Sequence, residues 1–102
     1  MFGKKKTAPW ITVLDRNGDV LISAPLYECP LKDDGVVALS IEFFDDPHPC
    51  EIHRGAVRWR VMDDLHDRSD GSWIDINSLN EEIRLVMPAE AAKIRVAPYT
   101  KD

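Results

Sequence analysis

The sequence predicts an all-β fold, a small antiparallel β-sandwich or sandwich-like barrel of about seven or eight short strands. Several segments alternate apolar and polar residues with a period of two, and Gly, Pro, Asn and Asp separate these segments at short intervals. With 102 residues, the chain is long enough for one core. We therefore expect a single β domain over residues 9–100, preceded by a disordered basic tail over residues 1–8 that contains Lys4-Lys5-Lys6.

The first two strands are predicted at residues 10–14 and 20–22. Between them, residues 15–19 read Asp-Arg-Asn-Gly-Asp, and Asn-Gly readily takes the positive φ angles of a tight reversal. The same five residues resemble the start of an EF-hand calcium loop, but Gly18 occupies the fourth position instead of the sixth. This departure favours a β-hairpin.

Three more strands are predicted in the middle of the chain. Every odd-numbered residue of segment 37–43 is apolar, and in segment 56–62 three apolar residues alternate with two arginines. Segment 72–76 follows a turn at Asp70-Gly71, so we expect it to be the antiparallel neighbour of segment 56–62.

The C-terminal third leaves two alternatives. Segments 83–87 and 93–96 alternate as two strands joined by a short loop, and together they resemble the penultimate strand pair of many sandwich modules. One short helix near residues 78–87 is the alternative, because Ser78 and Glu81 have the spacing of a capping box. We favour the two strands. The predicted core contains Val13, Ile22, Leu39, Ile41, Val57, Trp59, Val61, Ile74, Ile76, Leu85, Ile94 and Val96.

Charge and hydropathy exclude two classes of partner. The formal net charge is −5, whereas binding of nucleic acid depends on lysine and arginine that neutralise phosphates. No segment has the roughly 20 apolar residues of a membrane helix, and no apolar signal core follows Lys6. We expect a small acidic protein of the cytoplasm that binds neither nucleic acid nor membranes.

Two sets of side chains are candidate metal ligands, although no cofactor is expected. Acidic residues in predicted loops could bind calcium through their oxygen atoms: Asp45, Asp46, Asp63, Asp64, Asp67 and Asp70. Thiols and imidazoles could bind zinc: Cys29, His48, Cys50 and His53. The zinc spacing matches no common zinc knuckle, and ordinary solvated loops are the favoured explanation of both sets. Whether Cys29 and Cys50 form a disulfide is left open.

The predicted function is non-catalytic recognition of another protein. We recognise no family resemblance across the chain, and no catalytic residue is assigned because the motifs of nucleophilic and phosphoryl-transfer enzymes are absent. Large aromatic residues near predicted turns suit a contact surface: Trp10, Tyr27, Trp73 and Tyr99. An acidic inhibitor or immunity-type protein with a basic target fits this pattern, as does an accessory protein of phage or other assemblies. The chain is expected as a monomer or as a homodimer formed through an edge strand. Metal binding, carbohydrate binding through a tryptophan, and an enzyme without a recognisable motif remain the alternatives.

Overall fold

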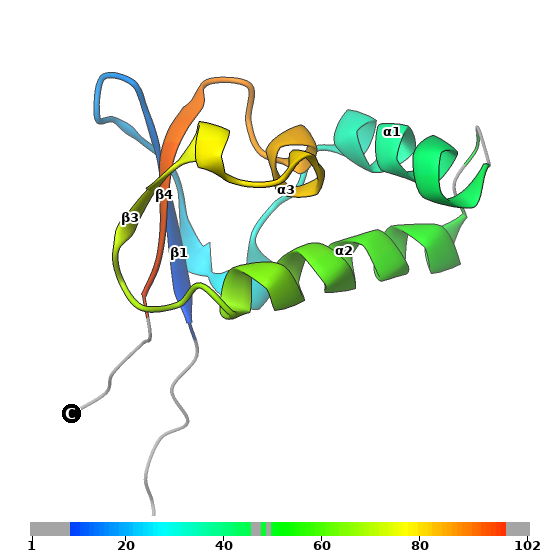
Figure 1. The fold of residues 1–102 in the computed structure, drawn as a ribbon, viewed down its shortest axis with the longest axis horizontal. Coiled ribbons are helices and arrows are strands. Elements are labelled where there is room, and N and C mark those ends of the chain that lie inside the picture. The colour runs from blue at the N-terminus through cyan, green and yellow to red at the C-terminus, as the bar shows by residue number, and fades with distance from the viewer. Residues whose placement is uncertain (1–8, 46–47, 49, 98–102) are drawn as a thin grey trace, which may run out of the picture.

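The chain folds into one four-stranded antiparallel sheet packed against a layer of helices (Figure 1). A computed structural model describes residues 9–45, 48 and 50–97. The elements are β1 (Trp10–Asp15), β2 (Val20–Pro25), α1 (Asp33–Phe44), α2 (Glu51–His66), β3 (Trp73–Asp75), α3 (Glu81–Val86) and β4 (Ala91–Ala97). Short 3-10 turns lie at Leu26–Glu28 (η1) and Ile76–Ser78 (η2). The prediction of an all-β sandwich or barrel with seven or eight strands is therefore wrong.

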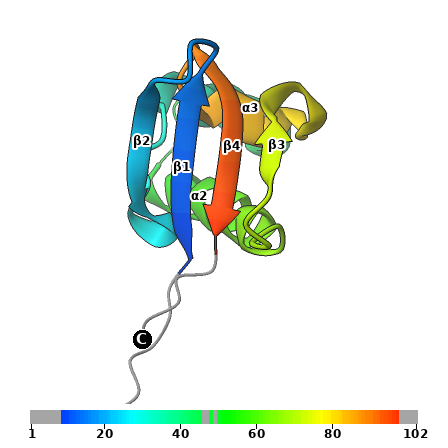
Figure 2. The same cartoon turned by 90° about the vertical axis from the view of Figure 1, so that its left-hand side faces the viewer.

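The helices cover only one face of the sheet. The strand order is β2-β1-β4-β3, so the last strand of the chain lies between β1 and β3. Seen from the sheet side, the four strands stand in front and the helices lie behind them (Figure 2). No helix or strand of the described residues covers the other face of the sheet, which we call uncovered.

The N-terminal hairpin is confirmed. Val13 pairs with Ile22 across β1 and β2, and Gly18 has a φ of +88° in the turn. Oδ1 of Asp15 accepts hydrogen bonds from the backbone N–H groups of Asn17 and Asp19, at 2.8 and 2.9 Å. The carboxylate of Asp15 thus stabilises its own turn, as expected for an aspartate at a turn start.

Segment 37–43, predicted as a strand, lies within helix α1. Val36, Leu39 and Ser40 are buried, with the spacing of one helical face. Ile41 was expected in the core and is 48% exposed. Because most residues from 36 to 44 are apolar, an apolar residue falls at every second position although the segment is helical. Two aspartates in the first turn of α1 stabilise the positive end of its dipole.

Segment 56–62, also predicted as a strand, lies within helix α2. The buried residues Val57, Val61 and Leu65 follow one another at intervals of four, which is helical spacing. Trp59 was expected beside Val57 and Val61 and points away from the core instead, with 67% of its surface exposed. Arg58 donates hydrogen bonds to the carbonyl oxygens of Tyr27 and Cys29, at 2.7 and 2.8 Å, and so ties α2 to the turn after β2.

The predicted strands in segments 72–76 and 93–96 are present as β3 and β4. Ile74 of β3 pairs with Ile94 of β4, so the neighbour predicted for this strand, segment 56–62, is wrong. Strand β1 pairs with β2 on one side and with β4 on the other. The edges of the sheet are therefore β2 and β3.

Segment 83–87 belongs mostly to helix α3, so the favoured two-strand interpretation is wrong and the short helix is present. The N-cap residue is Asn80 rather than Ser78: Oδ1 of Asn80 accepts from the backbone N–H of Ile83 at 3.0 Å. Nδ2 of Asn80 also donates to Asp64 of α2 at 2.7 Å. This one side chain starts α3 and joins it to α2.

Substituting Asn80 by Ala is expected to lower the free energy of unfolding by about 1 to 2 kcal/mol, because it removes a helix cap and a hydrogen bond to a carboxylate. Chemical unfolding followed by circular dichroism measures the change. Asn77→Ala in the preceding turn is the control, since only its backbone N–H is bonded, and we expect a change within about 0.5 kcal/mol. Equal losses for the two variants would contradict the cap.

The core lies between the sheet and the helices. Most of the predicted core is buried there, namely Val13, Ile22, Leu39, Val57, Val61, Ile94 and Val96, and Ile74, Ile76 and Leu85 pack against it partly buried. Ile41 and Trp59 are the two errors, and both follow from the wrong period in the two long helices. None of the helices in the described residues has the length and apolar character needed to cross a membrane.

Candidate functional site

The uncovered face of the sheet is the first candidate site. Successive side chains of a strand point to opposite faces, and Ile11, Val13, Ile94 and Val96 are buried under the helices. The residues between them therefore point to the opposite face of the sheet. We call this surface the outer sheet face; it comprises Trp10, Thr12, Leu14, Ser23, Trp73, Asp75, Lys93 and Arg95.

The outer sheet face brings together two of the tryptophans predicted to bind a partner. Arg95 of β4 pairs with Thr12 of β1 on one side and with Trp73 of β3 on the other. Adjacent strands lie about 4.8 Å apart, so Thr12 and Trp73 are separated by about 10 Å across Arg95. Trp10 lies two residues before Thr12 on the same face, and the two indoles are 38% and 43% exposed.

Both indole rings are held in place by polar neighbours. Nε1 of Trp10 donates to Oγ of Ser23 on β2 at 3.0 Å. The guanidinium of Arg95 stacks over the ring of Trp73, with its central carbon 4.5 Å from the ring centroid. Aromatic surface is thus presented with little side-chain entropy left to lose on binding.

The outer sheet face carries two cations, Lys93 and Arg95, and one anion, Asp75. Within the described part of the chain, Arg95 and Lys93 form no ion pair, and the Nε–H of Arg95 is buried without an acceptor. Asp75 is the acidic residue of the face, and its Oδ1 already accepts from the backbone N–H of Asn77 at 2.9 Å. A ligand carboxylate that pairs with the guanidinium of Arg95 would gain a charge-assisted hydrogen bond.

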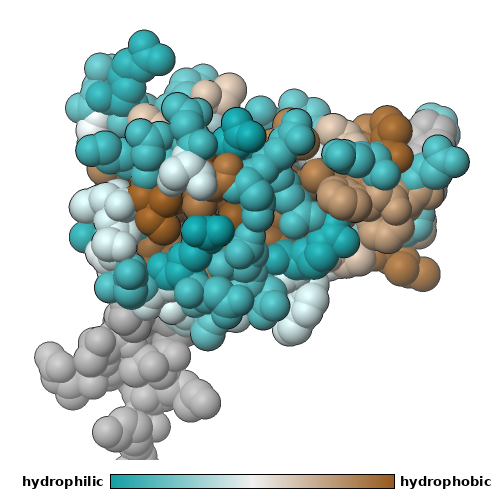
Figure 3. Space-filling model, viewed as in Figure 1, coloured by the Kyte–Doolittle hydropathy of each residue, from teal (hydrophilic) through white to brown (hydrophobic). Residues whose placement is uncertain are grey.

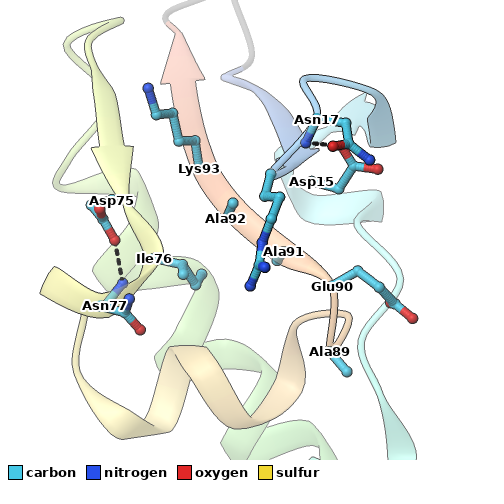
Figure 4. Close-up of a pocket in the computed structure, with 11 residues that line it drawn as sticks. Asp15, Asn17, Asp75, Ile76, Asn77, Ala89, Glu90, Ala91, Ala92 and Lys93 are labelled. Atoms are coloured by element: carbon cyan, nitrogen blue, oxygen red, sulfur yellow. Dashed lines mark hydrogen bonds between the residues drawn. The ribbon is translucent and has the colours of Figure 1, made fainter.

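A shallow hollow of about 740 Å³ opens beside this face, at the end where the β1–β2 turn meets the loop before β4 (Figure 4). Its walls are residues 15–17, 75–77 and 89–93. The carboxylates of Asp15 and Asp75 are turned to the backbone N–H groups of their own turns (Figure 4). The described residues that line the hollow include the charged side chains of Asp15, Arg16, Asp75, Glu90 and Lys93 and no serine, cysteine or histidine.

The predicted zinc ligands are not brought together. Cys29 is buried after η1, Cys50 is exposed at the start of α2, and His53 stacks on the ring of Phe44 with centroids 4.2 Å apart. His48 is exposed before α2. Among the described residues, no three His, Cys, Asp or Glu side chains lie close enough to hold a metal ion.

The predicted calcium ligands are dispersed or already engaged. Asp45 follows α1, whereas Asp63, Asp64 and Asp67 lie at the far end of α2, and Asp46 is outside the described residues. Asp64 accepts from Asn80 and pairs with Arg68 at 3.7 Å. Asp70 accepts from the hydroxyl and backbone N–H of Ser72 at 2.6 and 2.9 Å, and these bonds lower the pKa of its carboxyl.

The two cysteines are free thiols in different surroundings, which predicts different reactivity. Burial raises the pKa of Cys29 from 9.0 to about 11, against the opposing effect of Arg58. At pH 8 we expect iodoacetamide to label Cys50 and to reach Cys29 only on unfolding, because the thiolate is the nucleophile. The raised pKa also means that the stability from Cys29 is complete below pH 9.0 and is lost as pH rises towards 11.

Mass spectrometry of the labelled chain measures both thiols, with Cys50→Ser as the control that should leave the native protein unlabelled. Labelling of Cys29 in the folded chain at a rate similar to that of Cys50 would show that its burial is wrong.

The other predicted contact residues lie elsewhere. Tyr27 is exposed but lies against α2, where its ring centroid is 6.2 Å from that of His66. Tyr99 is outside the described residues. Sequence reasoning missed Arg95, whose neighbours depend on strand order, and it missed a second apolar surface on α2. We call that surface the outer α2 stripe; it comprises Ile52, Gly55, Ala56 and Trp59.

Comparisons with family models, curated proteins and solved structures found no match to this chain.

Proposed function

We propose that this chain is a non-catalytic module that recognises another protein through the outer sheet face. One observation carries the proposal: Trp10 and Trp73, from distant parts of the sequence, share the uncovered face of the sheet with Arg95 between Trp73 and Thr12. Tryptophan and arginine dominate the binding energy of protein interfaces. Because strands β1, β4 and β3 hold these groups, a partner meets a rigid surface.

The charges of the face define the partner. The net charge of −5 favours a basic protein at long range, but the contact surface itself carries two cations, Lys93 and Arg95, against one anion, Asp75. We propose a partner whose contact patch is apolar with at least one carboxylate, which would accept from Arg95. An inhibitor, an immunity-type protein or an assembly accessory protein all act by such stoichiometric contact. We further propose a cytoplasmic location, where Cys29 and Cys50 would stay reduced.

The test compares partners captured by the wild-type chain and by two variants. Trp73→Ala and Arg95→Gln each remove one half of the stacked pair on an exposed face, so both variants should fold. For a partner captured from the cells that make this protein, we expect each variant to weaken binding by about 30-fold, the loss typical of an interface hot spot.

Trp59→Ala is the matched control, because Trp59 is an exposed tryptophan on the helical side of the molecule. A partner that binds the two sheet variants as tightly as the wild type, or that loses affinity only for Trp59→Ala, would refute the proposal.

A carbohydrate ligand is the second candidate, and the same two indoles favour it, since exposed rings on one flat face can stack on sugars. Trp10 and Trp73 are both accessible there. Glycan binding predicts a change in tryptophan fluorescence that Trp73→Ala abolishes and a chelator leaves unchanged. A protein ligand of the kind proposed above predicts no response to glycans.

A further inference from the structure

The outer α2 stripe lies on the side of α2 opposite the core. Ile52 and Trp59 are seven residues apart, so they lie within about 20° of each other around the helix. They are 79% and 67% exposed. Apolar residues also gather over the ends of α1 and α2 that lie away from the sheet (Figure 3). Isolated exposed apolar residues are common, but two large ones aligned on one helix mark a contact surface.

Gly55 lies between these two residues, and nothing in the described part of the chain packs against it. A Cβ built on Gly55 would meet no atom within 4 Å, and Gly55 is not among the described glycines with a positive φ. Glycine within a helix lowers helix propensity, and here no contact of the same chain compensates for the loss. Gly55 and Ala56 leave a shallow gap between Ile52 and Trp59, which suits the close approach of another helix.

We infer that the occupant of this stripe is a second copy of the chain, with the two α2 helices antiparallel and crossing beside Gly55 and Ala56. The stripe is self-complementary in this arrangement. Positions at equal distances on either side of the crossing face each other, so Ile52 of one copy packs on Trp59 of the other, and this contact occurs twice. The small residues meet at the centre, where the helices come closest.

Charge favours the antiparallel direction. Asp63 lies one turn beyond Trp59, is exposed and forms no ion pair among the described residues. Antiparallel packing places each Asp63 towards the N-terminal end of the other α2, where the helix dipole is positive but Glu51 of the first turn already carries a negative charge. What favours this direction is the distance that it sets between the two Asp63 residues. The two Asp63 residues are then about 22 Å apart, from a rise of about 1.5 Å per residue. Parallel packing would set them side by side.

The first experiment measures mass by sedimentation equilibrium from about 10 µM to about 1 mM chain, because one helix per copy buries less than the roughly 1,200 Å² of stable interfaces. We expect the average mass to rise from 11.6 kDa towards twice that value. Gly55→Gln fills the gap between the helices while leaving the single chain unstrained, and we expect it to weaken association at least about 10-fold.

Trp59→Ala should weaken association by a similar factor, whereas Trp73→Ala, the matched tryptophan of the outer sheet face, should leave it within about twofold. A chain that stays at 11.6 kDa throughout overturns the inference and assigns the stripe to a different protein. Association that Gly55→Gln and Trp59→Ala both leave unchanged also overturns it.

A second experiment fixes the direction of the helices. In a Cys50→Ser background, Gly55→Cys places two thiols beside the crossing point, where we expect mild oxidation to give a covalent dimer. Asp63→Cys places them too far apart and should remain monomeric on a reducing-agent-free gel. Equal cross-linking at both positions would contradict antiparallel packing, and cross-linking at residue 63 alone would replace it with a parallel pair.

Discussion

Gly35→Ala is expected to destabilise the fold by at least about 3 kcal/mol or to prevent folding altogether. Gly35 lies in the first turns of α1, where the helix crosses α3. A Cβ at this position would lie 2.0 Å from the carbonyl oxygen of Leu85 and 2.9 Å from Cα of Val86. These are backbone atoms, so no side-chain rotation relieves the clash, and α1 would have to move away from α3.

The control for this variant is Gly55→Ala, which makes the same change in the other long helix. Nothing lies within 4 Å of its added Cβ, so we expect a gain of about 0.5 to 1 kcal/mol from helix propensity. Urea unfolding at low micromolar concentration measures both. Similar effects of the two substitutions would show that α1 does not approach α3 as closely as the structure has it.

Val61→Ala is expected to cost about 2 to 3 kcal/mol, whereas Trp59→Ala should cost less than about 1 kcal/mol despite removing a much larger side chain. Val61 is fully buried and its loss leaves a cavity, while Trp59 is 67% exposed. The comparison separates the two interpretations of segment 56–62. On a strand both residues would share the buried face, and Trp59→Ala would be the more damaging change, since a buried Trp→Ala costs about 3 to 5 kcal/mol. Thermal unfolding of the monomer at low micromolar concentration shows directly which of the two substitutions destabilises the fold more.

The parts of the fold that the sequence predicts correctly depend on local chemistry. The β1–β2 hairpin follows from Asn17 and Gly18, because the turn needs a positive φ and Gly18 supplies it. Strands β3 and β4 are also predicted locally, because in each of them apolar and polar residues alternate within a few residues of a turn. Which strands pair with each other is not local: Ile94 pairs with Val13 and Ile74, and no pattern near any of them indicates this order.

The two long helices were missed because a seven-residue window satisfies more than one period. In α1 five of the seven residues of the window are apolar, so helical and extended patterns fit equally well. In α2 the apolar residues Val57, Trp59 and Val61 do alternate with arginines, but the segment is helical and the alternation is a coincidence. The wider window from Val57 to Leu65 holds the deciding signal, three buried residues at intervals of four.

The sequence allowed some residues of the candidate site to be named, but it did not allow their arrangement in space to be predicted. Trp10 and Trp73 were identified because large aromatics favour interfaces. Arg95 was not, since its importance comes from lying between Thr12 and Trp73 in the folded sheet. Within the described residues the fold also keeps the predicted zinc ligands apart: Cys29 lies after η1, whereas Cys50 and His53 lie at the start of α2.

Site-specific photo-crosslinking tests the central claim, that the outer sheet face binds a protein partner. A photoreactive amino acid replaces Thr12, at the middle of the outer sheet face, or Glu42, an exposed residue of α1 on the helical side. We predict that irradiation in the producing cells links the Thr12 variant, and not the Glu42 variant, to one partner, and that Arg95→Gln abolishes the product. A partner linked from Glu42 alone, or a Thr12 product that persists with Arg95→Gln, would contradict this account.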